Sequence, residues 1–279
     1  MIANARMYSI VPAAGQCWQQ LLERLSESVG VPLKYLEHRP PAPINELWRR
    51  EDLGAVFMGG LPFARSVPRP PIVAAPVPSP PSFQDQPQYW TDLVVRADSD
   101  FRTLEDTFGH RIALTMMDSH SGCLAVLYHV MSAAKDRRAL YQRVIEPRFT
   151  PLGAMTAVID GLADVAPLDS FALSLARQHI PELAAQLRVV ASTEPTPIPP
   201  LVSSGPVHPA LESAFLEAHK NASMLPLMAK LGISRFVRPD PDSYDVLKRR
   251  FDAAITFWHE HPFACSVHPE FAQLATGPM

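Results

Sequence analysis

The sequence has few cysteines, little net charge and no long apolar run, and each shortage excludes a class of protein. Cys17, Cys123 and Cys265 are far apart and odd in number, so they form no disulfide framework, which suits a reducing compartment. No run of about 18 apolar residues exists, which predicts no insertion into a membrane. The formal net charge of −3 predicts no surface for nucleic acid or anionic lipid.

Motifs for catalysis and nucleotide binding are also missing. There is no glycine-rich phosphate loop, no His-Glu-x-x-His and no Gly-x-Ser-x-Gly, so we expect no cofactor. The first residues lack a basic stretch followed by about 7–15 apolar residues, and so they do not form a secretory signal. Together with Met1, this predicts a cytoplasmic protein, or a periplasmic one if a leader was removed.

The clearest candidate for a metal cluster lies near the end of the chain. His259, His261, Cys265 and His268 are close in sequence. Pro262 breaks the helix between them, so their spacing is not the i, i+4 pair of a helical zinc site. We therefore expect no metal at this cluster, whose role the sequence leaves open.

Thirty prolines are present among 279 residues, about twice the usual share of roughly 5%. They concentrate in residues 68–87 and 195–206. Because β-prone residues lie within or beside both stretches, and because proline fixes φ, we interpret them as rigid extended connectors rather than disordered segments.

Short apolar strands alternate with helical patterns along the chain, which is typical of an α/β protein with parallel sheets and helices on both faces. We expect a first series up to residue 75 and a second series from residue 111. The predicted strands are residues 7–11, 32–36, 55–58, 72–75, 89–96, 111–116, 163–166 and 187–192, with a strand edge at 148–151. The predicted helices include 44–50, 153–160 and one that ends at Gly30, and we expect mainly helices from residue 208 onward.

Two extended crossings between these series predict a two-lobed clamshell. Lobe 1 comprises residues 1–90 plus 197–279, and lobe 2 comprises residues 91–196, with hinges near 88–96 and 187–203. Ligands of open α/β sheets bind at the carboxyl ends of strands. We therefore expect the ligand to lie in a cleft between the lobes and to be enclosed by hinge closure.

A short polar stretch, Asp118-Ser119-His120-Ser121-Gly122, stands between a predicted strand and a predicted helix. The start of a helix offers unpaired N–H groups and about half a positive charge. Serine hydroxyls beside it can donate to an oxyanion, and glycine allows close approach of the backbone. The alternative is that a serine only caps its own helix.

Other polar or small residues stand at or near predicted strand ends, and each has an ordinary structural alternative. Gly60-Leu61 could be a simple turn, Tyr89 a sheet aromatic, and Asp169 an N-cap. The remaining candidates are Tyr8 near the first strand and Thr91 on the crossing strand. Ser119 or Ser121 could act as a nucleophile only with a base held by a third group, and no such group can be named.

Taken in order, these motifs resemble the phosphate/phosphite/phosphonate-binding family of type 2 periplasmic binding proteins. The resemblance runs from about residue 7 to 260. It rests on Met7-Tyr8, Gly60-Leu61-Pro62, Tyr89-x-Thr91-x-Leu93-Val94-Val95, Asp118-Ser119-His120-Ser121-Gly122, Gly161-Leu162-Ala163-Asp164-Val165-Ala166-Pro167-Leu168-Asp169-Ser170 and Pro197-Ile198-Pro199-Pro200-Leu201-Val202.

The resemblance implies a non-enzymatic receptor in which Ser119, His120 and Ser121 hold the oxyanion and Tyr89 forms a wall. It implies that Tyr8 and Gly60-Leu61 close the other side, and that Asp169 faces the variable end of the ligand. Sequences of this family often carry Gly-Ser-His before the helix that precedes the Gly-x-Ala-Asp motif. Here Phe149-Thr150-Pro151 stands instead, so one anion contact is missing or supplied by Thr150.

We therefore predict a solute-binding protein for a small anion of the phosphonate or phosphate kind, with membrane subunits of an ABC transporter as possible partners. One alternative is a cytoplasmic enzyme on the same fold, similar to chorismate dehydratase, with Asp118, His120 and Asp169 as candidate acids or bases. Another alternative is a ligand sensor that acts through a separate partner.

Overall fold

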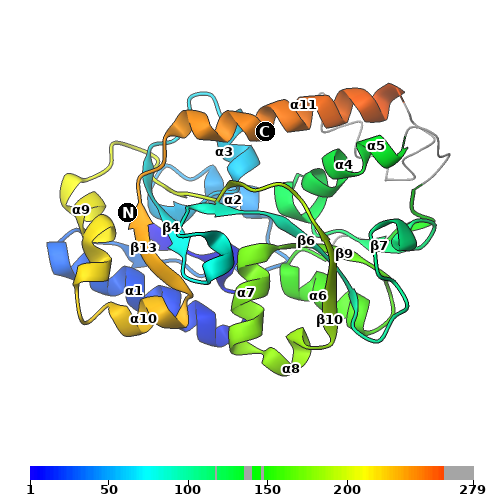
Figure 1. Ribbon diagram of the computed structural model, residues 1–279. Coiled ribbons are helices and arrows are strands. Elements are labelled where there is room, and N and C mark those ends of the chain that lie inside the picture. The colour runs from blue at the N-terminus through cyan, green and yellow to red at the C-terminus, as the bar shows by residue number, and fades with distance from the viewer. Residues whose placement is uncertain (117, 135–139, 146–147, 261–279) are drawn as a thin grey trace. The chain divides into compact units, whose positions relative to one another are not determined.

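The computed structural model describes residues 1–116, 118–134, 140–145 and 148–260, which divide into two compact units (Figure 1). Unit 1 comprises residues 1–89, 174–179 and 196–244. Unit 2 comprises residues 90–173, 180–195 and the chain from 245 onward. The sequence placed residues 197–279 in one lobe, whereas the structure groups α11 (Asp245–Glu260) with unit 2, where it packs against α4 (Ala125–His129).

Unit 1 contains a six-stranded mixed sheet. Its strand order is β13 (Ile233–Val237), β4 (Ile72–Pro78), β12 (Leu201–Val202), β3 (Leu53–Phe57), β1 (Ile2–Asn4) and β2 (Lys34–Tyr35). The strand β1 is parallel to both β2 and β3, as the β-α-β rhythm predicts. By contrast, β12 and β13 are antiparallel to their neighbours. The sequence did not predict β13, because it expected mainly helices after residue 208.

The predicted first strand at residues 7–11 is wrong in position. The strand ends at Asn4, because the Asn4 side chain accepts a hydrogen bond from Arg6 N (2.8 Å) and donates one to Leu36 O (2.7 Å). A turn of 3-10 helix follows at Arg6–Tyr8, and α1 (Pro12–Val29) begins with proline in its first turn. Gly30 ends α1 with φ 65°, which confirms the predicted C-terminal stop.

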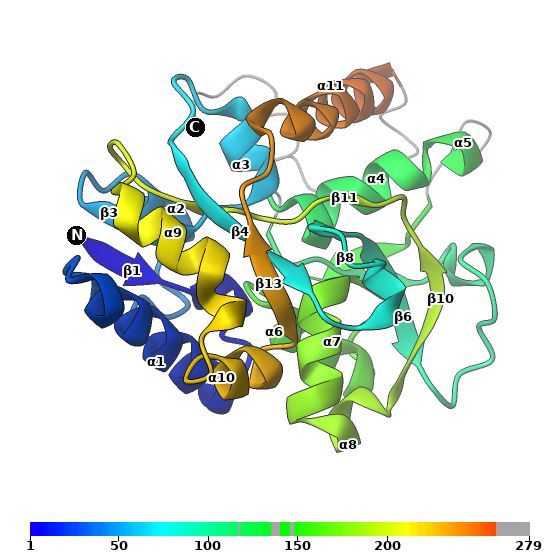
Figure 2. The same ribbon diagram turned by 60° about the vertical axis from the view of Figure 1, so that its left-hand side comes forward.

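The helices of unit 1 pack on one another and on the sheet. Figure 2 shows α1 beside α9 (Pro209–Glu217) and α10 (Leu225–Lys230), and both of these also contact β13. The remaining elements of unit 1 are α2 (Ile44–Trp48), α3 (Gly60–Arg65), β5 (Gln88–Tyr89), β11 (Thr196–Pro197) and the 3-10 turns Pro81–Phe83, Ala218–Lys220 and Pro241–Tyr244.

An aromatic cluster fixes the carboxyl ends of β1 and β3 in unit 1. The Phe57 ring lies 5.0 Å from the Tyr8 ring and 5.0 Å from the Trp18 ring, and both pairs meet edge to face. All three side chains are buried. Because such pairs add to the area that they bury, this cluster sets the position of the chain that leaves each strand.

Unit 2 is built around β6 (Thr91–Arg96), which pairs in antiparallel fashion with β10 (Leu187–Ser192) and β9 (Ala166–Asp169). The strand β7 (Arg111–Ala113) is parallel to β8 (Arg143–Ile145), and a parallel bridge joins Ile112 to Val165. Four strands of this unit therefore share one direction, and the crossing strand β6 runs against them.

Helices of unit 2 cover these strands and contact one another. The helix α6 (Pro151–Ile159) packs on β6 and β9, while α4 packs on β6 and α11 on α4. The remaining elements are the helical turns Glu105–Thr107 and η4 (His120–Leu124), α5 (Met131–Ala134), α7 (Ser170–His179) and α8 (Pro181–Ala184); the division between units passes through α7. In the described part of the chain, no helix has the length and apolar character needed to cross a membrane.

We expect Phe57→Ala to destabilise unit 1 by about 3–5 kcal/mol, because it leaves a cavity between Tyr8 and Trp18. Urea unfolding followed by tryptophan fluorescence measures this loss. The matched control is Val67→Ala, whose side chain is 96% exposed and should change the free energy of unfolding by less than about 0.5 kcal/mol. Equal effects of the two substitutions would contradict the role of the aromatic cluster.

Candidate anion-binding site

The helix that follows β7 begins at His120 with Ser119 as its N-cap, within the polar stretch where the sequence predicted a helix to start. Ser119 has extended backbone angles (φ −75°, ψ 128°), and its hydroxyl oxygen accepts a hydrogen bond from Gly122 N at 3.1 Å. Leu124 N donates to Ser119 O, five residues back, so the first turn η4 is a wide π-turn that continues into α4. Ser119 therefore caps its helix, which is one of the two roles that the sequence left open. Turns of this wide kind are frequent at functional sites.

Gly122 is required by close packing. A Cβ atom at this position would lie 1.7 Å from Thr115 Oγ1, 2.8 Å from Thr115 Cβ and 3.0 Å from Ser119 Oγ. The Thr115 backbone is held to the same point, because its N–H donates to Gly122 O at 3.3 Å. Only glycine allows Thr115 to lie against the first turn of the helix.

Ser121 has a hydroxyl that the fold does not use. Its carbonyl oxygen accepts a hydrogen bond from Thr91 Oγ1 at 3.1 Å, whereas the described residues provide no hydrogen bond to its own hydroxyl. The side chain is half-buried in the first helical turn. This hydroxyl is therefore the group at the helix start that is best placed to donate to a bound anion.

His120 is buried at the same helix start and is neutral at ordinary pH. Burial, with a smaller contribution from the positive charge of Arg250, lowers its pKa to about 3. Arg250 comes from α11, lies over the Tyr128 ring at 5.5 Å and donates to a Glu194 carboxylate oxygen. A neutral imidazole can donate one hydrogen bond but supplies no formal charge to an anion.

Thr91 and Asp169 lie beside this helix start and are opposite each other across the β6–β9 pair. Thr91 is fully buried. One carboxylate oxygen of Asp169 accepts hydrogen bonds from Phe171 N and Ala172 N, each at 2.9 Å, and so caps the start of α7. The strand β9 also contacts η4. The predicted site residues of unit 2 therefore lie on elements that neighbour one another; they are Thr91, Ser119, His120, Ser121 and Asp169.

A second helix start lies next to the first. Thr150 caps α6 by accepting a hydrogen bond from Gly153 N at 3.0 Å. Thr115 links the two starts, because its carbonyl oxygen accepts from Phe149 N at 3.2 Å while its N–H donates to Gly122 O. The sequence suggested a strand edge at residues 148–151, which is wrong, because Thr150 and Pro151 begin a helix here.

Arg148 is a candidate residue that the sequence analysis missed. Its backbone N–H donates to Leu114 O at 3.0 Å, and its Cβ lies 3.2 Å from where a Cβ on Gly153 would stand. The Nε atom of its guanidinium is buried and has no hydrogen-bond partner in the part of the chain that the structure describes. A buried donor without a partner at a helix start is a natural contact for an anion. Its isolated position in the sequence gave no signal of this.

The predicted residues of unit 1 are all buried. The parallel strands β1 and β3 place Tyr8 and Gly60 at the same edge of the sheet. Gly60-Leu61 is the first turn of α3 rather than a loop. Tyr89 pairs with Thr196 across β5 and β11. Tyr8, Leu61 and Tyr89 are each 1% exposed, so their side chains stabilise unit 1.

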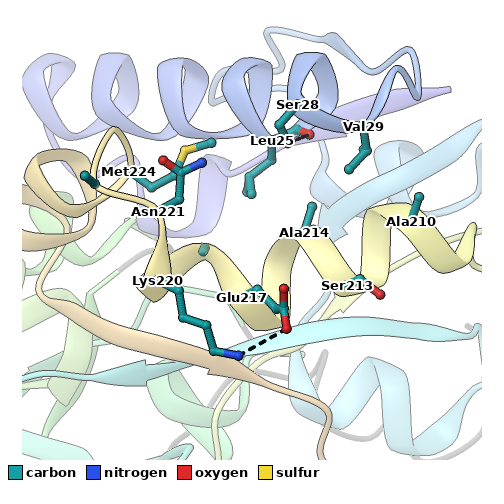
Figure 3. A pocket seen from close by; sticks show the side chains of 12 residues that line it. Leu25, Ser28, Val29, Ala210, Ser213, Ala214, Glu217, Lys220, Asn221 and Met224 are labelled. Atoms are coloured by element: carbon teal, nitrogen blue, oxygen red, sulfur yellow. Dashed lines mark hydrogen bonds and ion pairs between the residues drawn. The ribbon is translucent and has the colours of Figure 1, made fainter.

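The structure also contains a groove of about 630 Å³ between α1 and α9 in unit 1 (Figure 3). Small and alkyl side chains line most of it, including Leu25 and Ala214. Its charged groups already pair, because Lys220 Nζ lies 3.1 Å from a Glu217 carboxylate oxygen. The groove contains none of the predicted site residues, and its paired charges do not suit an oxyanion.

Asp118, a candidate acid or base in the enzyme alternative, directly precedes the Ser119 cap. Burial raises the pKa of its carboxyl group. The described residues contain no cluster of three or more histidine, cysteine or acidic side chains that could hold a metal. His261, Cys265 and His268 lie outside the described residues, as does the side chain of His259, so the role of that cluster stays open.

Comparison with known proteins places this arrangement in a family. The profile of the family described as "ABC transporter, phosphonate, periplasmic substrate-binding protein" matches residues 13–244. The chain belongs to this phosphonate-binding family. It is therefore a substrate-binding protein homologue, as the sequence motifs predicted, and the family is one of solute-binding proteins rather than of enzymes.

Solved structures confirm the type 2 periplasmic-binding-protein fold of this family member. The binding component of an ABC phosphonate transporter from Pseudomonas aeruginosa is similar with a TM-score of 0.77 and 20% identity, over 98% of this chain and 92% of that one. PhnD1 from Prochlorococcus marinus, solved with methylphosphonate, is similar with a TM-score of 0.74 and 15% identity, over 91% of this chain and 97% of PhnD1. A Xanthomonas citri protein bound to ATP is similar with a TM-score of 0.62 and 18% identity, over 94% of this chain and 98% of that one. No curated protein matches the chain.

Gly122→Ala should destabilise unit 2 by about 1–3 kcal/mol, because the added methyl group overlaps the Thr115 side chain. Chemical unfolding measures the loss. Gly205→Ala is the matched control, since a Cβ at Gly205 meets no atom within 4 Å. An unchanged stability for Gly122→Ala would show that Thr115 does not pack against this helix start.

The buried neutral His120 should make the protein sensitive to acid. The unfolded chain binds a proton at this group near its ordinary pKa of about 6.5, whereas the folded chain binds it only near 3. Stability is therefore lost as pH falls through this window, by roughly 1 kcal/mol per pH unit. His120→Gln should flatten this slope in urea unfolding at about pH 6, 5 and 4. The exposed His129→Gln is the control, and an equal slope in all three proteins would contradict the assignment.

Proposed function

We propose that this family member captures a small oxyanion of the phosphonate class at the two linked helix starts of unit 2 and delivers it to the membrane subunits of an ABC transporter. The observation that carries the proposal is the half-buried Ser121 hydroxyl, which the fold leaves without a hydrogen bond to any described residue. It stands in the first turn of a capped helix, where N–H groups point outward.

The physical basis is a set of donors already held in place. Two helix starts, at Ser119 and Thr150, each contribute N–H groups and partial positive charge. Both are fixed through Thr115, so little ordering is needed when a ligand binds. Arg148 adds a full positive charge with a buried donor that lacks a partner.

The chemistry of the donors favours a tetrahedral oxyanion over a carboxylate. A phosphonate presents three oxygens to surrounding donors, whereas a carboxylate presents two. Hydroxyl, backbone and guanidinium donors come here from separate elements, which suits three oxygens that point in different directions. The relative from Prochlorococcus marinus was solved with methylphosphonate, which supports the same ligand class here.

We propose binding without catalysis. Of the candidate acids and bases, His120 has its pKa lowered to about 3, which makes it a weak base. Asp169 already accepts two backbone hydrogen bonds as the cap of α7. Asp118 has a raised pKa but has no partner assigned as nucleophile or orienting group. Family membership supports the same conclusion.

Ser121→Ala should weaken methylphosphonate binding about 10- to 100-fold, since hydrogen bonds to charged groups contribute about 1.5–3 kcal/mol. Isothermal titration calorimetry measures the affinity, and thermal shift confirms that the variant is folded. Ser213→Ala, in the groove of unit 1, is the matched control and should bind as the wild type does. Ser119→Ala is less informative, because it also removes a helix cap worth about 1 kcal/mol.

Three results would count against this function. The wild type could bind neither methylphosphonate nor phosphate nor sulfate, or it could bind acetate more tightly than all of them. Ser121→Ala could also bind as tightly as the wild type, which would move the site elsewhere.

A further inference from the structure

Phe149 stands in a backbone conformation that aromatic residues rarely adopt. Its φ is 56°, in the left-handed region that glycine occupies freely. Within the described part of the chain, the other non-glycine residues with positive φ are Gln84 and Asp85, and Phe149 is the one aromatic among them. The backbone here is fixed on both sides, because Phe149 N donates to Thr115 O and Thr150 begins α6.

The phenyl ring does not compensate for this strain by filling the core. Phe149 is 48% exposed. Glycine would satisfy the same turn without a steric cost. A large apolar side chain kept at a strained and exposed position suggests a functional contact rather than a structural one.

The neighbours of Phe149 along the chain suggest what its ring contacts when a ligand is bound. Phe149 lies between Arg148, with its unpartnered buried Nε, and Thr150, which caps α6. Its N–H is bonded to Thr115, the residue that also packs on Gly122. Phe149 is therefore next to the groups to which we assign the oxyanion.

We propose that Phe149 forms the wall for the organic substituent of the ligand, so that this protein prefers phosphonates with an apolar alkyl or aryl group over inorganic phosphate and over aminoalkyl phosphonates. The inference rests on the proposed function. An apolar substituent that covers the ring removes apolar area from water on both partners, and an aryl group adds a favourable ring contact. Phosphate has no substituent and gains nothing from the ring.

The test compares phosphate, methylphosphonate, propylphosphonate, phenylphosphonate and 2-aminoethylphosphonate by calorimetry on wild type and Phe149→Gly. We expect wild type to bind propyl- and phenylphosphonate most tightly. Phe149→Gly should weaken the binding of these two ligands about tenfold and change the affinity for phosphate by less than about twofold. The same variant should melt about 2–4 °C higher, because glycine relieves the strained φ.

Two further variants separate the ring from the backbone. Phe149→Leu keeps an apolar wall and should retain most of the preference for propylphosphonate. Gln84→Gly relieves a similar positive φ (55°) in unit 1 and should change no affinity. If Phe149→Gly lowers the affinity for all ligands equally, or lowers it for none, the inference is overturned. If wild type binds aminoethylphosphonate most tightly, it is overturned as well. If wild type binds no oxyanion at all, the proposed function fails first and this inference fails with it.

Discussion

The close contact between Thr115 and Gly122 is the constraint on which the candidate site depends. It forces glycine into the first turn of the helix after β7, since any Cβ there would overlap the threonine side chain. The carbonyl oxygen of Thr115 also holds the turn before α6, because it accepts a hydrogen bond from Phe149 N. The N–H groups at the starts of η4 and α6 are therefore held in place through the same residue, Thr115. If an anion binds here as we propose, its binding need not supply the energy to assemble these donors.

Much of this arrangement could be predicted from sequence because it follows local rules. The Ser-x-Ser-Gly stretch after an apolar strand indicated a capped helix, and Gly30 indicated the end of α1. Apolar runs and their order predicted the α/β class, whereas the family was suggested by the resemblance of the ordered motifs to known sequences. These features depend on residues close in the chain, where capping, φ preference and periodicity determine the structure.

The rest depends on tertiary contacts that no local rule contains. The strand β13 is short and gains its stability from β4, α9 and α10, so a helical interpretation of that segment was wrong. The turn that carries the buried Nε of Arg148 and the positive φ of Phe149 is held by backbone hydrogen bonds to Leu114 and Thr115, which are more than 30 residues away in sequence. The neutral state of His120 comes from burial and from Arg250, which is far away in sequence.

The most direct test of the account is the response of backbone amide NMR signals to methylphosphonate. The account predicts the largest shifts at His120, Ser121 and Gly122 and at the first turn of α6, together with a shift of the Arg148 Nε signal. Signals of the α1–α9 groove, such as Ala214, should stay in place. Large shifts in that groove with none at Ser121 would contradict the claim that the linked helix starts of unit 2 bind the oxyanion.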